Sequence, residues 1–206
     1  MEIPSFYTIS DPQVSVRGAK YALLSTNRIH GDNKLRLTIG DKTTPCSTPF
    51  GVSSFNNNDS TRKNIELTIC PSDEAKINDI YNWALDYLAS KPDNFFKKTV
   101  SKAELQELFK HPIVKKEKYE PRLKCKIDIA GKNMVRCWDA KNERCDLPSD
   151  LRGYKLIPRI CYNHIWFMSK ELGFVCLVTD LQILECEDQT CPFEWVSRWK
   201  LANIND

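Results

Sequence analysis

The sequence predicts an α+β fold that is mainly β, a barrel or strongly curved sheet with two inserted helices. Two observations predict it. Six or seven short segments have the alternating pattern of strands and form two groups, and two helical segments separate these groups, at about 72–90 and 101–111. Strands and helices do not alternate regularly, so a doubly wound parallel sheet is disfavoured. We expect one domain over residues 1–206, with a C-terminal tail from about residue 186.

Length and composition favour a globular protein. The chain has 206 residues, of which 41% are hydrophobic and 28% charged, so it can bury a core without disulfide bonds. The longest uninterrupted apolar run, FVCLV, is too short to span a bilayer, and the first ten residues lack the basic and apolar regions of a secretory signal peptide. The nine cysteines are odd in number and include no C-x-x-C pair, so reduced thiols are expected. These features predict a soluble intracellular protein.

The first third of the chain is predicted to be β. Strand-like patterns occur at 14–25, 34–39 and 65–70, and the second of these alternates cleanly between apolar and polar residues. The segment 40–64 is rich in Pro, Ser, Thr and Asn and is predicted to be a loop. Within it, PFGVSSF at 49–55 has more large apolar side chains than an idle linker needs.

Two helices are predicted next. Apolar residues of the first recur at helical spacing and form one stripe, made by Ile77, Ile80, Tyr81, Ala84, Leu85 and Leu88. The second opens with Ser101 and Glu104, the S-x-x-E pattern of a capping box, and stops before Pro112. Both helices therefore lie between the two groups of strands.

After Pro112 the chain is predicted to be β again. In 121–130 the residues Leu123, Cys125, Ile127 and Ile129 face one way, and Arg122, Lys124, Lys126 and Asp128 face the other. A Gly-containing turn leads to MVRCWDA, and 145–153 has loop composition. The aromatic stretch 158–185 is predicted to form two strands around a turn at Ser169–Gly173.

The sequence gives little support for a metal site or for a catalytic site. The tightest metal-ligand pairs are Cys161-x-x-His164 and Cys186-x4-Cys191, but residues three apart in a strand point to opposite faces, which disfavours a zinc site. The three histidines lie in no catalytic signature, and the chain has neither a P-loop nor a G-x-G-x-x-G motif. We expect no enzyme activity, no metal and no cofactor.

The charge is unevenly distributed along the chain. The formal net charge is only +3, but from Phe95 to Arg136 there are twelve Lys or Arg against five Asp or Glu. From Glu171 to Ser197 there are six acids and no Lys or Arg. A basic middle and an acidic end favour a polyanionic partner, although ordinary solvated surface with chance clustering remains an equal alternative on charge alone.

These features together predict a nucleic-acid-binding surface. Cations at a spacing of roughly 6–7 Å along one strand face suit the phosphates of an extended single strand, and rings suit its bases. The predicted binding residues are Arg122, Lys124, Lys126, Lys97, Lys98, Lys115, Lys116, Lys118, Arg136, Arg159, Trp138, Tyr162, Trp166 and Phe167. Rings in strands usually belong to the core, so two of the four aromatics are expected there. Only one of the adjacent Trp166 and Phe167 can point inward.

An ordered set of motifs over roughly 20–185 carries a resemblance to a known family. It consists of PFGVS at 49–53, the strand IELTI, the P-x-L-x-C-K strand at 121–126, and the last block with its aromatic pair and Gly-Phe. In order and character these motifs resemble the single-stranded-DNA-binding proteins of nucleocytoplasmic large DNA viruses, such as giant viruses and African swine fever virus. The resemblance implies an OB-like β-barrel with helical insertions that coats single strands, independently of sequence, in viral DNA replication, recombination and repair. It implies no catalysis.

The resemblance matches the cationic strand 122–126 and the aromatic segment 162–167 to the core of that barrel. It also implies single-stranded DNA as the partner and the infected host cell as the location, at a cytoplasmic replication site, in the nucleus or packaged in the virion. Many strand-coating proteins end in a long acidic tail. This chain is acidic there only locally and then becomes aromatic and basic (EWVSRWK), which puts partner recruitment in doubt and leaves self-association as an alternative.

Other interpretations stay open at this point. RNA competes with DNA as the ligand, because no residue can be identified that reads the 2′-OH. A protein-interaction or structural module could use the same aromatic side chains for a partner chain. A homo-oligomer and replication proteins remain open as partners, and a zinc-dependent fold is the weakest alternative.

Overall fold

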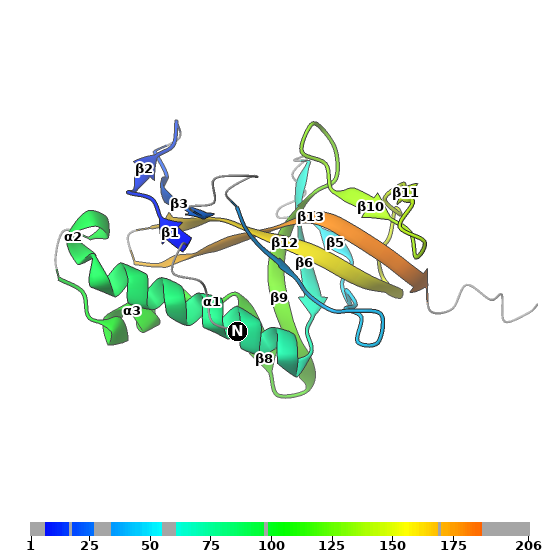
Figure 1. Ribbon diagram of the computed structural model, residues 1–206, viewed down its shortest axis with the longest axis horizontal. Coiled ribbons are helices and arrows are strands. Elements are labelled where there is room, and N and C mark those ends of the chain that lie inside the picture. Colours follow the sequence, from blue (N-terminus) through cyan, green and yellow to red (C-terminus); the bar gives the residue numbers. More distant parts are fainter. Residues whose placement is uncertain are drawn as a thin grey trace, which may run out of the picture.

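The computed structural model describes residues 7–16, 18–26, 34–54, 61–96, 99–168 and 170–186. Within these ranges the chain is mainly β, with one large sheet and three helices (Figure 1). The strands are β1 (Tyr7–Ile9), β2 (Gln13–Val14), β3 (Lys20–Thr26), β4 (Leu35–Thr38), β5 (Val52–Ser53), β6 (Arg62–Thr68), β7 (Phe109–Lys110), β8 (Ile113–Lys116), β9 (Tyr119–Asp128), β10 (Arg136–Trp138), β11 (Arg144–Cys145), β12 (Tyr154–Phe167) and β13 (Leu172–Cys186). The helices are α1 (Pro71–Ser90), α2 (Pro92–Phe95) and α3 (Lys102–Leu108).

The β12–β13 hairpin is the longest strand pair and forms the centre of the sheet, whose main path is β1-β3-β12-β13-β9-β6-β5. This confirms the two strands predicted within 158–185. The other edge of β12 pairs with β3 and β4, and the other edge of β13 pairs with β7, β9 and β10. Three register irregularities interrupt the hairpin, and the one at Asn163 changes which face the following side chains occupy.

The sheet bends sharply where β9 meets β13. β9 pairs with β6 along seven residues but with β13 only at Lys126 and Ile127. The described strands do not close into a continuous barrel, so the predicted barrel is a curved sheet. Its two sides are joined by Cys46, which exchanges two hydrogen bonds of 2.8 Å with Leu156 of β12, and by Ser47, whose carbonyl accepts a 2.9 Å bond from Thr68 of β6.

The core follows the predicted alternation. Leu35 and Leu37 of β4, Ile65 and Leu67 of β6, and Leu123, Cys125 and Ile127 of β9 are all buried. They belong to one continuous cluster that also takes in the apolar stripe of α1. The predicted strand at 14–25 differs, because a turn at Gly18 divides it into β2 and β3, which pair with each other.

The helices lie along one side of the hairpin (Figure 1). In α1 the ring of Tyr81 stacks on Phe109 at 5.2 Å between centroids, and the Tyr87 hydroxyl donates a 3.1 Å bond to the carbonyl of Ile9. The predicted capping box of α3 is present. This helix ends at Leu108, short of the predicted residue 111, because Phe109 and Lys110 continue as β7 and pair with β13. The helix α2 was not predicted. None of the described helices is long and apolar enough to cross a membrane.

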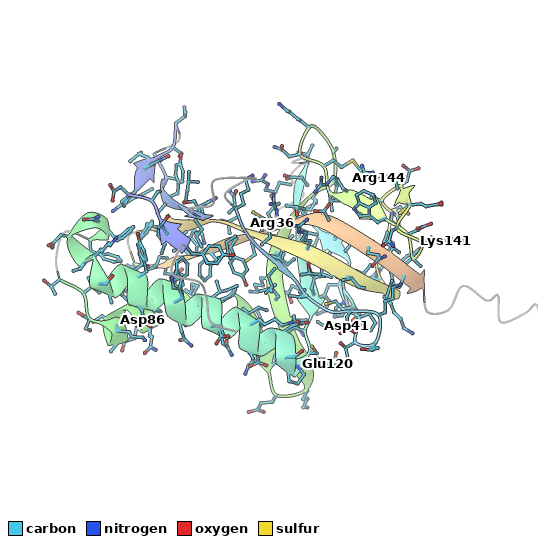
Figure 2. All side chains as sticks on the ribbon, in the orientation of Figure 1. Arg36, Asp41, Asp86, Glu120, Lys141 and Arg144 are labelled. Atoms are coloured by element: carbon cyan, nitrogen blue, oxygen red, sulfur yellow. The ribbon has the colours of Figure 1, made fainter. Side chains whose placement is uncertain are left out.

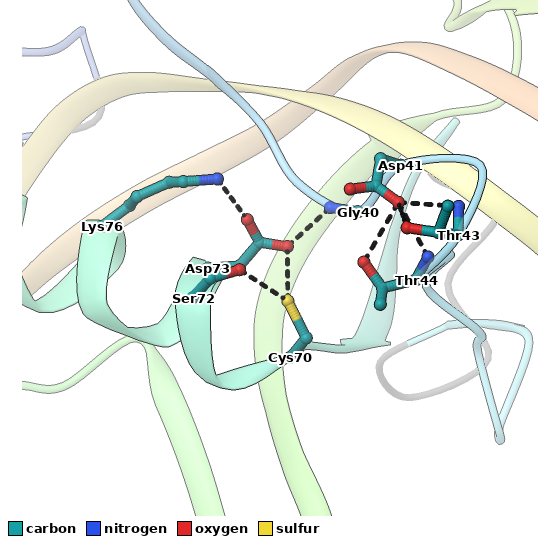
Figure 3. A network of polar contacts seen from close by, with 8 residues as sticks. All are labelled: Gly40, Asp41, Thr43, Thr44, Cys70, Ser72, Asp73 and Lys76. Carbon is teal, nitrogen blue, oxygen red and sulfur yellow. Dashed lines mark hydrogen bonds and ion pairs between the residues drawn. The ribbon is translucent and has the colours of Figure 1, made fainter.

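A buried carboxylate fixes the start of α1 to the loop after β4 (Figure 3). Asp73, only 2% exposed, accepts hydrogen bonds from the Gly40 amide at 2.6 Å, from Lys76 Nζ at 2.7 Å and from Cys70 Sγ at 3.3 Å. Gly40 has a φ of 69°, and a Cβ there would lie 3.0 Å from Cys46 Sγ. Burial and the charge of Asp73 raise the pKa of the Cys46 thiol to about 12, so this thiol stays protonated.

Replacing Asp73 with Ala should therefore destabilise the fold. The Gly40 amide and the Lys76 ammonium would lose a buried acceptor, and we expect a loss of about 1–3 kcal/mol in the free energy of unfolding. Urea denaturation measures it. Asp86→Ala is the matched control, because that carboxylate is 61% exposed and pairs with Lys102 at the surface (labelled in Figure 2), where the expected loss is below about 1 kcal/mol. Equal losses for the two variants would contradict the role of Asp73.

Candidate nucleic-acid interface

The sheet has an outer face that turns away from the core and is built by five adjacent strands. Since side chains alternate along a strand, the residues between the buried ones lie on this face. It carries Tyr21 and Leu23 of β3, His164 and Trp166 of β12, Val175 and Leu177 of β13, Lys124 and Lys126 of β9, and Arg62 and Asn64 of β6.

Three rings on this face form an aromatic strip, which we define as Tyr21, His164 and Trp166. Trp166 lies opposite Tyr21 on one side and opposite Gly173 on the other. A Cβ at Gly173 would lie 2.9 Å from Trp166 Cζ2, so the indole rests against the Gly173 backbone and only glycine leaves it room. The Tyr21 and His164 rings meet edge-on at 5.6 Å, and the Tyr21 hydroxyl donates to Gln13. The rings of the strip are therefore held by their neighbours.

The adjacent Trp166 and Phe167 point to opposite faces, as predicted. Phe167 packs toward the core, where its ring stacks on Phe95 at 6.2 Å and Lys20 Nζ lies 5.3 Å from its centroid. Phe167 is thus removed from the candidate interface.

Tyr162 was also predicted to bind nucleic acid, and the structure contradicts the exposure that this requires. Its side chain is fully buried, with the ring perpendicular to Phe174 at 5.2 Å, and burial raises the pKa of its hydroxyl well above the usual value. The bulge at Asn163 is the reason, because it places Tyr162 on the inner face and His164 on the outer face although they are two residues apart.

The predicted row of cations on β9 is only partly present. Lys124 and Lys126 are exposed, but Arg122 is 4% exposed and its Nε donates a 2.8 Å bond to Glu66 on β6. The expectation that Arg122 is an exposed member of the row is therefore wrong. At the other end of the row Asp128 is buried and accepts two bonds of 2.7 Å from Arg62. Two exposed lysines remain between two ion pairs.

Lys126 and the aromatic strip share one electrostatic environment. Burial lowers the pKa of His164, and the positive charge of Arg62 lowers it further. The same two causes, burial first, lower the pKa of Lys126, whose Nζ also donates to Asn64. Only β13 separates β12 from β9, which pairs with β13 at Lys126 and Ile127. The strip and Lys126 therefore lie on the same side of the sheet, and Arg62 acts on the pKa of both His164 and Lys126.

The remaining predicted lysines differ in their surroundings. Lys115 forms an ion pair with Glu74 of α1, while Lys116 and Lys118 are exposed in the β8–β9 hairpin. Lys97 and Lys98 lie outside the described residues, as does the C-terminal tail beyond Cys186.

Trp138 and Arg136 belong to a separate cluster at the β10–β11 end of the sheet, where Figure 2 labels Arg144. Asp180 forms an ion pair with Arg136 at 2.7 Å and accepts a 3.4 Å hydrogen bond from Trp138 Nε1. The Arg144 guanidinium lies 5.0 Å from the Trp138 ring centroid. Arg159 is exposed and lies opposite Asp180 in the strand register. One acid and one stacked cation thus engage Trp138 at this end of the sheet.

Sequence reasoning missed Tyr21, His164 and Arg62 as members of the site. Tyr21 and His164 lie on strands that were predicted, whereas Arg62 lies in the segment 40–64 that was predicted to be a loop and instead begins β6. The place of each beside Trp166 or Lys126 depends on which strands pair. In the described part of the chain, no three His, Cys, Asp or Glu side chains converge on a possible metal position.

The fold belongs to a known class. No family model matches the sequence, and no curated protein matches it. The mainly β architecture, with a large curved sheet and few helices, is similar to that of a phage single-stranded-DNA-binding protein. The particular neighbour is gp2.5, a single-stranded DNA binding protein encoded by bacteriophage T7, with a TM-score of 0.52 and 13% identity over 80% of this chain and 94% of that one.

Two further neighbours are structures of the single-stranded DNA-binding protein from bacteriophage Enc34. One has a TM-score of 0.43 and 9% identity over 90% of this chain and 94% of that one. The other, in complex with ssDNA, has a TM-score of 0.40 and 8% identity over 88% of this chain and 94% of that one. At such identities the likeness to gp2.5 establishes the fold.

The lowered pKa of His164 predicts acid sensitivity of folding. In the unfolded chain the imidazole returns to about 6.5, so below that pH the unfolded state binds more protons than the folded state, and stability falls as the pH decreases. His111, whose pKa is also lowered by burial, acts in the same direction. Urea unfolding between pH 7 and 5 should show a shallower loss for His164→Gln than for wild type. Parallel curves would contradict the assignment.

Proposed function

We propose that the outer face binds single-stranded DNA without reading its sequence. Lys124 and Lys126 contact backbone phosphates, and bases stack on Trp166 and its neighbours in the aromatic strip. The observation that carries the proposal is the placement of the strip and the exposed lysines on one sheet face, one strand apart. The shared fold with gp2.5, itself a single-stranded DNA binding protein, supports it.

The arrangement suits a single strand better than a duplex. The Trp166 ring rests against the Gly173 backbone, so only a base that has left its own stack can cover it. Every base has a π-face, and stacking contributes about 1–3 kcal/mol per base whichever base is present. The lysines add counterion release, which is equally independent of sequence. Both contributions tolerate any sequence.

The role we propose is non-enzymatic coating of single strands in viral DNA replication, recombination and repair. The resemblance to the proteins of nucleocytoplasmic large DNA viruses supports a viral role of this kind, in an infected host cell, as does the phage origin of gp2.5. An OB-like strand arrangement in which Cys46 and Ser47 complete the barrel is part of the same proposal.

Fluorescence anisotropy with labelled oligonucleotides tests this function. The wild-type protein should bind single-stranded DNA more tightly than the matching duplex, and the logarithm of the affinity should fall linearly with the logarithm of salt concentration. An RNA oligonucleotide of the same sequence tests the competing ligand. No preference for single strands, or an affinity independent of salt, would refute the proposal. Tighter binding to the RNA oligonucleotide than to DNA would mean that RNA, and not DNA, is the ligand.

Single substitutions separate the two contributions. Lys124→Ala and Lys126→Ala should weaken binding to all sequences alike and make the salt dependence shallower by about one counterion each. Trp166→Leu should weaken binding by about 1–3 kcal/mol with the slope unchanged, because stacking releases no counterions.

Lys141→Ala is the matched control for the lysine variants. Lys141 is exposed at the far β10–β11 end (labelled in Figure 2), so its loss should change the affinity and the slope least. A Lys141 variant that lowers the slope as much as Lys124→Ala would mean that general charge, and not this face, binds DNA.

A further inference from the structure

We infer that Phe50 and Tyr119, which flank Arg122 on the outer side of β9, form a second base-stacking site for the same DNA strand. The inference rests on the proposed function and adds residues that neither charge nor pattern had singled out for binding. It also gives a role to PFGVSSF, the loop segment whose apolar side chains the sequence left unexplained.

The three side chains form a cluster of planar groups. Arg122 Cζ lies 5.1 Å from the Phe50 ring centroid and 5.8 Å from the Tyr119 ring centroid. The guanidinium between them is held in place by its 2.8 Å bond to Glu66. Phe50 comes from the loop before β5 and Tyr119 from the start of β9, so two separate segments of the chain supply the rings.

The exposed fractions of the Phe50 and Tyr119 side chains indicate that these rings do more than shield Arg122 from solvent. Phe50 is 59% exposed and Tyr119 is 65% exposed, while Arg122 between them is 4% exposed. An aromatic side chain that only shielded Arg122 would gain from burying its own surface as well. Large rings left open to solvent and set against a fixed planar cation are suited to receive another flat group.

The position of this cluster continues the lysine row. Along β9 the residues Lys126, Lys124 and Arg122 follow one another at about 6–7 Å, the spacing that suits successive phosphates. A DNA backbone that passes over Lys126 and Lys124 therefore arrives at Phe50 and Tyr119 about two nucleotides later. A nucleotide at this point finds rings where the row no longer offers an exposed cation.

The net charge of the cluster determines how it contributes to DNA affinity. Glu66 pairs with Arg122, so the cluster is close to neutral. Its contribution should come from stacking and should not alter the dependence of affinity on salt. This separates it from the lysines.

Anisotropy with an oligo(dT) strand long enough to cover the whole outer face provides the test. Phe50→Leu and Tyr119→Leu keep apolar bulk but remove the ring, and each should weaken binding roughly ten-fold at every salt concentration, in parallel with wild type. Phe50→Tyr and Tyr119→Phe keep a ring and are the matched controls, which should bind within about two-fold of wild type.

Photocrosslinking of the wild-type protein gives an independent measurement that no variant's folding can affect. Oligo(dT) carrying 5-iodouracil should crosslink to the peptides that contain Phe50 or Tyr119, as well as to the one that contains Trp166. Wild type that binds DNA, together with leucine variants of unchanged affinity and no adduct at Phe50 or Tyr119, would overturn this inference and leave the proposed function standing. Failure of the wild-type protein to bind any single strand would instead refute the proposed function itself.

Discussion

The register between β12 and β13 is the constraint on which the rest of the structure depends. The other described strands attach to these two either directly, as β3 and β4 do to β12 and β7, β9 and β10 do to β13, or through one of these five. A slip of one residue would exchange the faces of all their side chains. The bulge at Asn163 makes such an exchange once, at a fixed place, so that Tyr162 completes the core and Trp166 faces outward. The aromatic strip exists because of this irregularity.

The electrostatics of β9 depend in the same way on its neighbour β6. Glu66 and Arg62 on β6 pair with Arg122 and Asp128, so both ends of the outer face of β9 are neutralised and partly covered. Burying either charge without its partner would carry a large desolvation cost. Only Lys124 and Lys126, in the middle, keep exposed ammonium groups. The small net charge of +3 therefore says little about this face, because the local arrangement decides which cations a ligand can reach.

Local patterns allowed much of the fold to be predicted from sequence. Alternation identified β4, β6 and β9 with their buried faces, and the S-x-x-E pattern identified the start of α3. These features depend on residues a few positions apart, and the hydrophobic effect acts on them in any mainly β context. The adjacency of Trp166 and Phe167 likewise settled that one ring had to face outward.

The failures have a common cause in long-range pairing. Arg122 looked exposed because Glu66, 56 residues earlier, is invisible to a strand pattern. Tyr162 looked like a partner of Trp166 because a bulge leaves no clear mark in the sequence. Tyr21 joins the aromatic strip only through the pairing of β3 with β12. The same long-range pairing lets Cys46 and Ser47, in a segment predicted to be a loop, join the two sides of the sheet.

Both proposed stacking sites use one physical device, a planar group immobilised from below and left accessible from above. The Trp166 indole rests on the Gly173 backbone, and the exposed rings of Phe50 and Tyr119 lie against the Arg122 guanidinium, which Glu66 fixes. A side chain that is already ordered loses little rotamer freedom when a base covers it, so more of the stacking free energy appears as affinity. This explains why the glycine of the Gly-Phe pair belongs to the binding face as much as the tryptophan does. A β-carbon at Gly173 would lift the indole from its support and return to it the freedom that binding must remove.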